Sequence, residues 1–410
     1  MIVLPVWITL PDGSSVEVGL LACTEPDDSG AFESEFAYHD AWLAHRDRFP
    51  LDPVSLPLGK GRFRARRLEP PLAVFDDALP DDWGREVIMR TRSLPRRQQG
   101  EPYLLQLMSE HGLGLGASSF SSREQASAQA SAPALAELAK AAQRFEAGLD
   151  LDDAQLQALF AAGSSPGGAR PKALVTDVTG AWIAKFPSAR RDGRFDIVGL
   201  EATGLDLAAR AGIVVPEHRL EKLGSGSRRA LLVRRFDVTP QGGRRHMISL
   251  RTLCKERPGI YALTYTELAE AVRRASTRPQ DDVDRLFRLM VFNSAFGNTD
   301  DHLKNFWMVH DDEGYRLSEA FDLLPDVGDR REHCLAFQYS RSAATREELL
   351  ALAGQWGVRD APGAIDAVAT AMAGFGAAAR RAQGQSRRDR QGHRAKGGTP
   401  RRAGPATLNT

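Results

Sequence analysis

The chain has 410 residues, of which 42% are hydrophobic and 26% charged, a composition typical of a globular protein with two or three domains. Its net charge of +1 conceals an asymmetry: residues from Arg380 onward carry nine Lys or Arg and one acid, a net +8, which leaves −7 on residues 1–379. The bulk charge of this mildly acidic body gives no reason to predict that it binds nucleic acid. The three cysteines are widely spaced without a CxxC pair, which argues against a disulfide framework or a zinc knuckle and favours a reducing compartment.

The N-terminus predicts a β-hairpin rather than a leader peptide. "MIVLPVWITLPDG" has no basic segment and reaches a Pro-Asp-Gly turn by residue 11, after which "VEVGLLAC" supplies a second strand. No apolar run approaches the roughly 18–20 residues that a membrane span needs. We therefore predict a cytoplasmic protein without membrane contact.

Residues 1–105 predict a small α+β module, and the stretch 101–125, with "SEHGLGLGASSFSSREQ", is predicted to be loop-like. A helix follows over 133–148. "AAGSSPGGARPKALV" (161–175) then predicts a Gly-rich loop that leads into a strand, and "KALVT" and "AWIAKF" predict a hairpin around "DVTG". Residues 195–212 predict a helix that ends at Gly212, and 228–238 predict another strand.

From about 248 to 378 the apolar spacing is mostly helical, as in "DDVDRLFRLMVFNSAF". The tail from about 380 has almost no large apolar residues and is predicted to be disordered. Its basic charge suits either a solvated end or a segment that binds nucleic-acid phosphates.

The polar decapeptide "GNTDDHLKNF" (297–306) directly follows a predicted buried helix. Asp300 and Asn305 are five residues apart, the interval at which protein kinases place the catalytic Asp and a magnesium-binding Asn. Seventeen residues after Asn305, Asp322 follows an apolar Phe at the end of a predicted hairpin and can supply a second metal carboxylate. Alone, such a pair occurs by chance in many chains, and His302 alone would more often be structural.

Three other segments supply what ATP chemistry needs. Lys185 lies on a predicted strand, and Glu201 follows sixteen residues later on a predicted helix, which is the arrangement of the kinase phosphate clamp. The glycines of "SSPGGAR" (164–170) let backbone N–H groups approach phosphates. "LLVRRFD" (231–237) lies where an adenine would bind the backbone between two lobes. Each segment alone is more simply explained as ordinary structure without a function, but together they occur along the chain in the order in which protein kinases have them.

Taken together, "GNTDDHLKNF", "EAFDLLPDV", "SSPGGARPKALV", "WIAKFPS" and "LVRRFD" resemble the HipA family, the serine/threonine kinase toxins of bacterial type II toxin–antitoxin modules. "FPLDPVSLPL" and "LPDDWGRE" resemble the N-terminal module of that family. The resemblance implies an α+β, two-lobed protein-kinase-like fold, with a nucleotide-binding lobe over 106–240 that holds a Gly-rich loop at 163–172. An all-helical catalytic lobe over 241–379 follows.

The resemblance also assigns roles to single residues. Asp300 matches the catalytic base, Asn305 and Asp322 the magnesium ligands, and Lys185, held by Glu201, the ATP lysine. Ser165, or next to it Ser164, matches the serine that family members autophosphorylate to silence the kinase. The other nucleotide contacts implied are the phosphate-loop residues Gly167, Gly168, Ala169, Arg170 and Lys172, the hinge residues Arg234 and Phe236, and the catalytic-loop residues His302 and Lys304.

The family implies ATP and Mg²⁺ as cofactors, a helix-turn-helix antitoxin that reaches operator DNA, and a translation component such as an aminoacyl-tRNA synthetase as substrate. The sequence departs from the family at Arg170, where Gln is common, at Asp301, where Gly is common, and at Arg234, where an acid can occur. Two alternatives stay open: a catalytically weak corepressor that acts with the antitoxin, and a kinase for a lipid or another small molecule.

Overall fold

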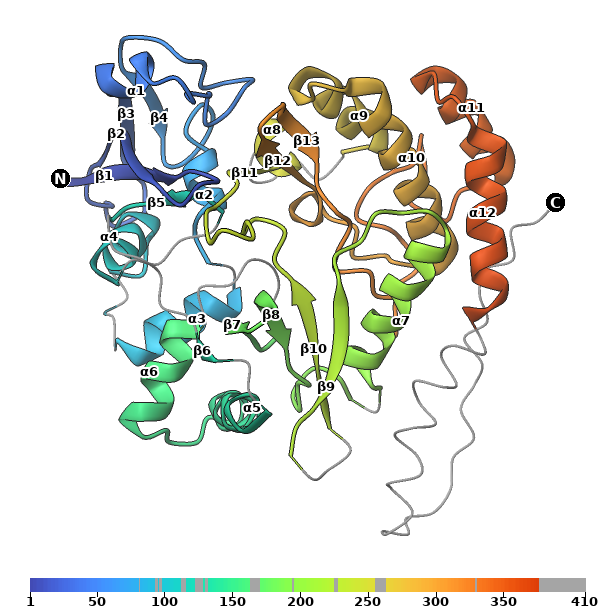
Figure 1. The fold of residues 1–410 in the computed structure, drawn as a ribbon, viewed down its shortest axis with the longest axis horizontal. Coiled ribbons are helices and arrows are strands. Elements are labelled where there is room, and N and C mark those ends of the chain that lie inside the picture. Colours follow the sequence, from blue (N-terminus) through green and yellow to red (C-terminus); the bar gives the residue numbers. More distant parts are fainter. Residues whose placement is uncertain are drawn as a thin grey trace.

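The computed structural model describes residues 1–80, 82–92, 95, 98–111, 116–121, 128–129, 132–162, 170–193, 195–224, 228–254, 263–328 and 330–375. Figure 1 shows an N-terminal module (blue), a lobe built on a second sheet (green), and a mainly helical lobe (yellow to red). The predicted disordered tail lies outside the described residues.

The N-terminal module is built on an antiparallel sheet with strand order β4-β3-β2-β1-β5. The predicted hairpin around the Pro-Asp-Gly turn is confirmed as β1 (Ile2–Thr9) and β2 (Ser15–Cys23). Val6, Ile8 and Phe36 point into a core from which water is excluded. The other elements are β3 (Glu33–Tyr38), β4 (Phe63–Arg66), β5 (Ser118–Ser119), α1 (Asp40–Ala44), α2 (Val74–Asp77) and α4 (Glu101–His111).

The prediction that residues 101–125 are loop-like is wrong for their first part, because Glu101–His111 form helix α4. Leu104, Leu105 and Met108 are fully buried, and the helix packs on β1. The spacing of Leu104, Leu105 and Met108 is helical, but the prediction of a loop was based on the glycines of "HGLGLG" that follow them. The helix is stabilised by a tertiary contact with a distant strand rather than by a strong local signal.

The second sheet has the order β6-β7-β8-β10-β9. It confirms the predicted hairpin as β7 (Lys172–Asp177) and β8 (Gly180–Lys185), and the predicted helix as α7 (Ile197–Arg210). One face packs on α3, α5 and α6, and the other on α7 (Figure 1). Its remaining elements are α3 (Asp82–Thr91), α5 (Ala132–Glu146), α6 (Asp153–Ala162), β6 (Ala128–Gln129), β9 (His218–Lys222) and β10 (Arg229–Arg234).

The third part packs helices around the buried helix α10, but it also carries the small sheet β11-β12-β13, so the prediction that the lobe over 241–379 is all-helical is wrong. The hairpin β12–β13 joins the segment of Asn305 to the segment of Asp322, as predicted from "NFWMV" and "YRL". The elements are β11 (Met247–Ser249), α8 (Leu250–Leu253), α9 (Tyr265–Ala275), α10 (Pro279–Phe296), the 3-10 turn η2 (Leu303–Asn305), β12 (Trp307–Asp311), β13 (Gly314–Leu317), α11 (Arg346–Trp356) and α12 (Ala361–Ala373).

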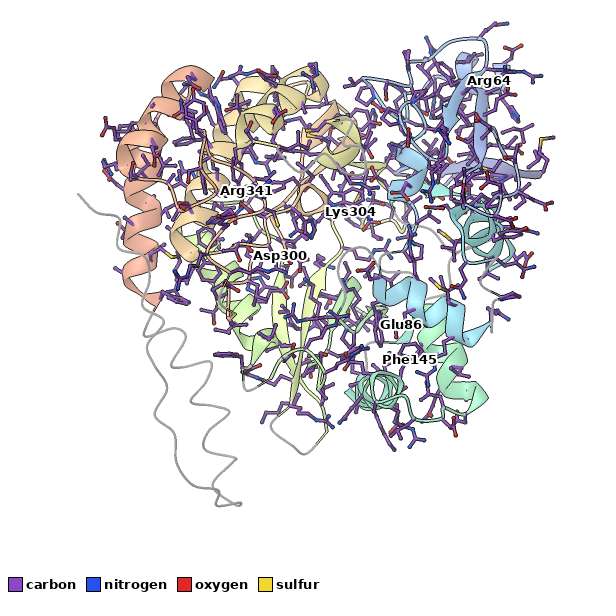
Figure 2. The ribbon with its side chains drawn as sticks, turned by 180° about the vertical axis from the view of Figure 1, so that it is seen from behind. Arg64, Glu86, Phe145, Asp300, Lys304 and Arg341 are labelled. Atoms are coloured by element: carbon purple, nitrogen blue, oxygen red, sulfur yellow. The ribbon has the colours of Figure 1, made fainter. Side chains whose placement is uncertain are left out.

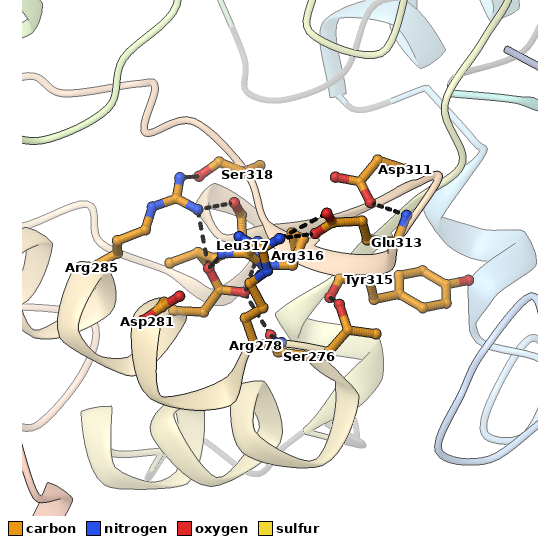
Figure 3. Close-up of polar contacts among 12 residues, drawn as sticks. Ser276, Arg278, Asp281, Arg285, Asp311, Glu313, Tyr315, Arg316, Leu317 and Ser318 are labelled. Carbon is orange, nitrogen blue, oxygen red and sulfur yellow. Dashed lines mark hydrogen bonds and ion pairs between the residues drawn. The ribbon is translucent and has the colours of Figure 1, made fainter.

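Polar contacts join α10 to the end of this hairpin (Figure 3). Asp282 is fully buried and accepts hydrogen bonds from Arg316 Nε at 3.0 Å, the Leu317 backbone N–H at 3.0 Å and Ser276 Oγ at 2.6 Å. Arg285 bridges from the same helix to the carbonyl oxygens of Leu317 and Ser318 at 2.7 and 3.0 Å. The end of β13 is therefore fastened to α10 just before the chain reaches Asp322.

The N-terminal module contacts the outer side of the same hairpin. The ring of Phe49 stacks on His310 of β12 with centroids 4.0 Å apart, and Tyr315 of β13 donates its hydroxyl to the Pro50 carbonyl at 2.7 Å. His246 Nε2 donates to the Leu51 carbonyl at 2.9 Å. Burial lowers the pKa of both His246 and His310 to about 4, so both imidazoles are neutral at pH 7.

Among the described residues, none of the helices combines the length and the apolarity that crossing a bilayer demands.

Candidate active site

Lys185 and Glu201 meet because of strand alternation. On β8, Trp182 and Ala184 face α5 and α6, so Lys185 points to the opposite face, where α7 lies. There its ammonium donates to the carboxylate of Glu201, a buried residue of α7, and to that of Asp322, at 2.5 Å from Nζ to Oδ1 in the second case. The structure thus brings together three residues that the sequence separates by 16 and 137 positions.

The single ammonium of Lys185 donates to two carboxylates in this cluster, and this shifts the pKa values of all three groups. Burial lowers the pKa of Lys185, but Asp322 and Glu201 outweigh it, so the pKa lies above its usual value and the amine stays charged. Burial also opposes ionisation of Asp322, yet Lys185 and Lys172 hold its pKa well below the usual range. For Glu201 burial prevails and the pKa is raised. Asp322 therefore keeps its charge, and Glu201 is the first of the pair to take a proton.

Asp322 enters the site in an unusual backbone conformation. Its φ is +57°, in the left-handed region that residues other than glycine seldom adopt, although Asp is among those that tolerate it best. Helix α7 approaches the next residue closely, since a Cβ added at Gly204 would lie 2.3 Å from the Leu323 carbonyl oxygen. Gly204 is one turn beyond Glu201, so this close approach keeps Glu201 beside Asp322.

We expect Gly204→Ala to weaken the cluster. The new methyl group would force α7 away from Leu323, so we expect unfolding to become easier by about 1–3 kcal/mol. The affinity for the predicted nucleotide should fall as Glu201 moves away from Asp322. Gly354→Ala on α11 is the matched control: its Cβ would meet no atom within 4 Å, so the helix gains Ala propensity without a clash. Denaturant unfolding and nucleotide titration of both variants check this, and equal behaviour would contradict the packing argument.

The predicted catalytic loop begins where α10 ends. Gly297 caps the helix with φ +71°, and the loop turns there into the Asp300 segment. Asn305 donates from Nδ2 to the Asp300 carbonyl at 2.8 Å, which fixes the spacing of the two predicted site residues. Asp300, His302 and Asn305 line one cavity of about 490 Å³ together with Lys185 and Asp322. The residues predicted for catalysis and for metal binding therefore converge on one cavity.

Asn305 and Asp322 fit a hard divalent cation. The Oδ1 atom of Asn305 is buried and has no hydrogen-bond partner among the described residues, while its Nδ2 atom is already used. A buried acceptor without a donor costs about 1–3 kcal/mol unless a ligand satisfies it. Amide and carboxylate oxygens are the ligands that Mg²⁺ prefers.

The carboxylate of Asp300 forms an ion pair with Arg330, at 2.8 Å from Oδ1 to Nη1, and both side chains are more than half exposed. Arg330 lies beyond Asp322 and lines the same cavity. This contact was not predicted from the sequence. The charged stretch "DVGDRREH" holds two adjacent Arg, and nothing in it indicates which of them reaches Asp300.

The phosphate end of the predicted nucleotide site is described only in part. Lys172 is buried and pairs in register with Lys185, and Arg170 contacts Asp192 at 3.0 Å from Nε to Oδ1. Both residues line the cavity. The predicted phosphate-loop residues Gly167, Gly168 and Ala169 and the predicted modification sites Ser164 and Ser165 lie outside the described residues.

The predicted hinge residues line a second cavity of about 660 Å³. The Phe236 ring lies 5.8 Å from that of Phe321, the neighbour of Asp322, so the hinge contacts the predicted metal segment. Arg234 shares the strand face of Trp182, with its guanidinium 4.9 Å from the indole, and donates to Glu217 at 2.8 Å. That face is opposite to the face of Lys185, so the Arg234 guanidinium points away from the Lys185 side.

His302 and Lys304 point in different directions. His302 lines the cavity of Lys185, whereas Lys304 lines a separate cavity of about 310 Å³ with Arg67 and Asp76 of the N-terminal module. In Figure 2, Asp300 lies toward the lobe of the second sheet, and Lys304 lies toward the N-terminal module. The structure does not bring Lys304 to the predicted nucleotide site.

Comparison with known proteins shows the family of the chain and its fold. The family model of the HipA N-terminal domain matches residues 14–115. In Sinorhizobium fredii (strain NBRC 101917 / NGR234), "Putative kinase Y4mE" is 32% identical over 155 residues, 35% of this chain and 34% of that protein. "Putative kinase Y4dM" of the same strain is 29% identical over 198 residues, 43% of this chain and 46% of that protein. These matches span about a third to a half of the length of the curated relatives.

The fold has a counterpart among solved structures. A chain of the "Shewanella oneidensis MR-1 Toxin Antitoxin System HipA, HipB and its operator DNA complex" superposes with a TM-score of 0.60 at 17% identity, covering 93% of this chain and 97% of that one. This likeness confirms the predicted two-lobed α+β kinase-like fold. The family model of the HipA-like C-terminal domain matches residues 164–376, which is more than half of the chain. The chain therefore belongs to the HipA family.

Proposed function

We propose that this protein is an ATP- and Mg²⁺-dependent serine/threonine protein kinase that acts as the toxin of a type II toxin–antitoxin module. The observation that carries the proposal is the convergence of Lys185, Glu201 and Asp322 in the cavity that Asp300 and Asn305 also line. Phosphoryl transfer depends on positioning and on neutralising charge, and these residues supply a cation, two metal ligands and a carboxylate base.

In this proposal each residue of the site has a separate task. Lys185, held by Glu201, binds the phosphates of the substrate ATP, and Asp300 orients the acceptor hydroxyl and accepts its proton. Asn305 and Asp322 would hold Mg²⁺, which supplies positive charge to the phosphate oxygens when bound. The described residues contain no group of three or more His, Cys, Asp or Glu that could hold a metal, so phosphates and water would complete the coordination shell.

The proposed partner is a helix-turn-helix antitoxin that carries the complex to operator DNA. The solved structure of similar fold contains HipA with HipB and operator DNA, which supports a partner of that class. A translation component such as an aminoacyl-tRNA synthetase is the proposed substrate, and Ser165 or Ser164 the proposed site of autophosphorylation. We place the protein in the cytoplasm.

Incubation with γ-labelled ATP and Mg²⁺ tests this function. We expect label on Ser165 or Ser164 in the wild type, because the loop that carries them precedes Lys172 at the phosphate end of the cavity. Label should be lost in Asp300→Gln, by roughly 10²–10⁴-fold for a missing general base, and in Asp322→Ala. Asp312→Ala, at the exposed tip of the hairpin, is the matched control and should keep its label.

Label that persists in both variants would contradict the assigned roles. A wild type that neither binds ATP nor becomes labelled would favour the corepressor alternative. Expression in bacteria gives a second measure: the wild type should slow growth, and Asp300→Gln should not.

A further inference from the structure

The residue next to the proposed base is turned away from the cavity. In the loop after α10, Asp300 has a side chain that is 60% exposed, Asp301 is fully buried and His302 again lines the cavity. Since Asp300 and Asp301 are joined by one peptide bond, the contacts that hold the buried Asp301 restrict the direction in which Asp300 points.

The Asp301 carboxylate is held by donors from distant parts of the chain. Tyr265 Oη of α9 donates to Oδ2 at 2.6 Å, His333 Nδ1 approaches Oδ2 at 3.0 Å, and the Cys334 backbone N–H donates to Oδ1 at 2.8 Å. Burial and the neighbouring Asp301 raise the pKa of Tyr265 well above its usual value, so the phenol stays protonated as a donor. His333 is itself buried. The carboxylate thus ties the catalytic loop to α9 and to the segment 333–335.

The hydrogen bonds continue from Tyr265 back to the cavity. Asn293 of α10 donates from Nδ2 to Tyr265 Oη at 3.0 Å, and Asn298 donates from Nδ2 to Asn293 Oδ1 at 3.1 Å. Asn298 is buried and lines the cavity of Lys185 and Asp300. In this series Asn298 donates to Asn293, Asn293 donates to Tyr265, and Tyr265 donates to Asp301. We call Asn298, Asn293, Tyr265, Asp301 and His333 the Asp301 network.

We propose that Asp301 is a positioning residue for the phosphoryl transfer, and that the Asp301 network holds the catalytic loop so that Asp300 faces the acceptor. The inference rests on the proposed function. Lys185, Glu201 and Asp322 are not among the members of the network, so its loss should slow the chemical step and leave nucleotide binding nearly unchanged. A displacement of about 1 Å at a reacting group can cost about 10²-fold in rate.

Asp301→Asn and Tyr265→Phe test this inference in the full chain. Asp301→Asn turns an amide N–H₂ toward donors, whereas Tyr265→Phe removes one donor and keeps the ring. We expect kcat for phosphoryl transfer to fall about 100-fold in Asp301→Asn and about 10-fold in Tyr265→Phe, with the Kd for Mg·ATP within threefold of the wild type. Asp366→Asn, which breaks only an exposed ion pair with Arg346, is the matched control and should leave kcat unchanged.

The outcomes separate this inference from the proposed function. An active wild type with unchanged kcat in a folded Asp301→Asn overturns the inference alone. Equal losses of kcat and of nucleotide affinity, accompanied by a lower melting temperature, also overturn it, because they indicate a purely structural role. If Asp301→Asn does not fold, Tyr265→Phe decides by the same split between kcat and Kd. A wild type that binds no Mg·ATP overturns the proposed function and this inference with it.

Discussion

Replacement of Lys185 by Met is expected to abolish phosphoryl transfer and to destabilise the protein. Two carboxylates would then share a buried site without their cation, since Glu201 is buried and the Asp322 side chain is only 29% exposed. Removing one partner of a buried ion pair costs about 3–5 kcal/mol, although protonation of Glu201 relieves part of that cost. The loss of a preorganised charge opposite the phosphates should reduce kcat by at least about 10²–10³-fold.

The free energy of unfolding, nucleotide titration and the transfer assay together check the Lys185→Met prediction. Lys222→Met, at the exposed end of β9 in the same sheet, is the matched control and should change neither stability nor activity. Lowering the pH should stabilise Lys185→Met relative to the wild type, because protons neutralise its unpaired carboxylates. A variant that keeps nucleotide affinity within threefold of the wild type would remove Lys185 from the nucleotide site.

The second large effect is expected at Asp282. Burial alone would raise the pKa of this carboxyl, but hydrogen bonds from Arg316, Ser276 and the Leu317 N–H outweigh it and keep the pKa below its ordinary value. Asp282→Ala leaves the Arg316 guanidinium and the buried Leu317 backbone N–H without their acceptor, so we expect a loss of about 3–5 kcal/mol in the free energy of unfolding. The end of β13 would also loosen, and with it the segment that carries Asp322.

The pH dependence of stability identifies the origin of this loss. A carboxyl whose pKa is lower in the folded state than in the unfolded state contributes its full stabilisation above about pH 4, and loses it as the pH falls through the folded-state value. The gap between wild type and Asp282→Ala should therefore narrow only in strong acid. Asp281→Ala, one residue earlier and 45% exposed, should cost less than about 1 kcal/mol. Equal costs at both positions would contradict the role given to Asp282.

The convergence of Lys185, Glu201 and Asp322 could be expected from the sequence, because local rules determine the directions of these side chains. Alternation along β8 places Lys185 on the face of the strand opposite to that of Trp182. Asp300 and Asn305 lie close together because one short turn holds both residues. The hairpins around Pro-Asp-Gly and "DVTG" could also be predicted from the sequence, because the residues that favour a turn lie within a few positions of one another.

Other parts depend on contacts that no local pattern records. Lys304 was expected at the nucleotide, but the 3-10 turn η2 rotates each residue by about a third of a turn, and Lys304 faces the N-terminal module. Arg330 reaches Asp300, and Tyr265 reaches Asp301, across 30 and 36 residues. Helix α4 was missed because its packing partner β1 lies about a hundred residues earlier in the chain.

The contact between Phe49 and His310 couples the N-terminal module to the hairpin β12–β13. Asn305 lies just before β12 and Asp322 follows β13, so a tilt of the hairpin would change the distance between the two proposed magnesium ligands. A protein that bound the N-terminal module would thereby act on the proposed magnesium site without entering the cavity that Lys185 and Asp300 line.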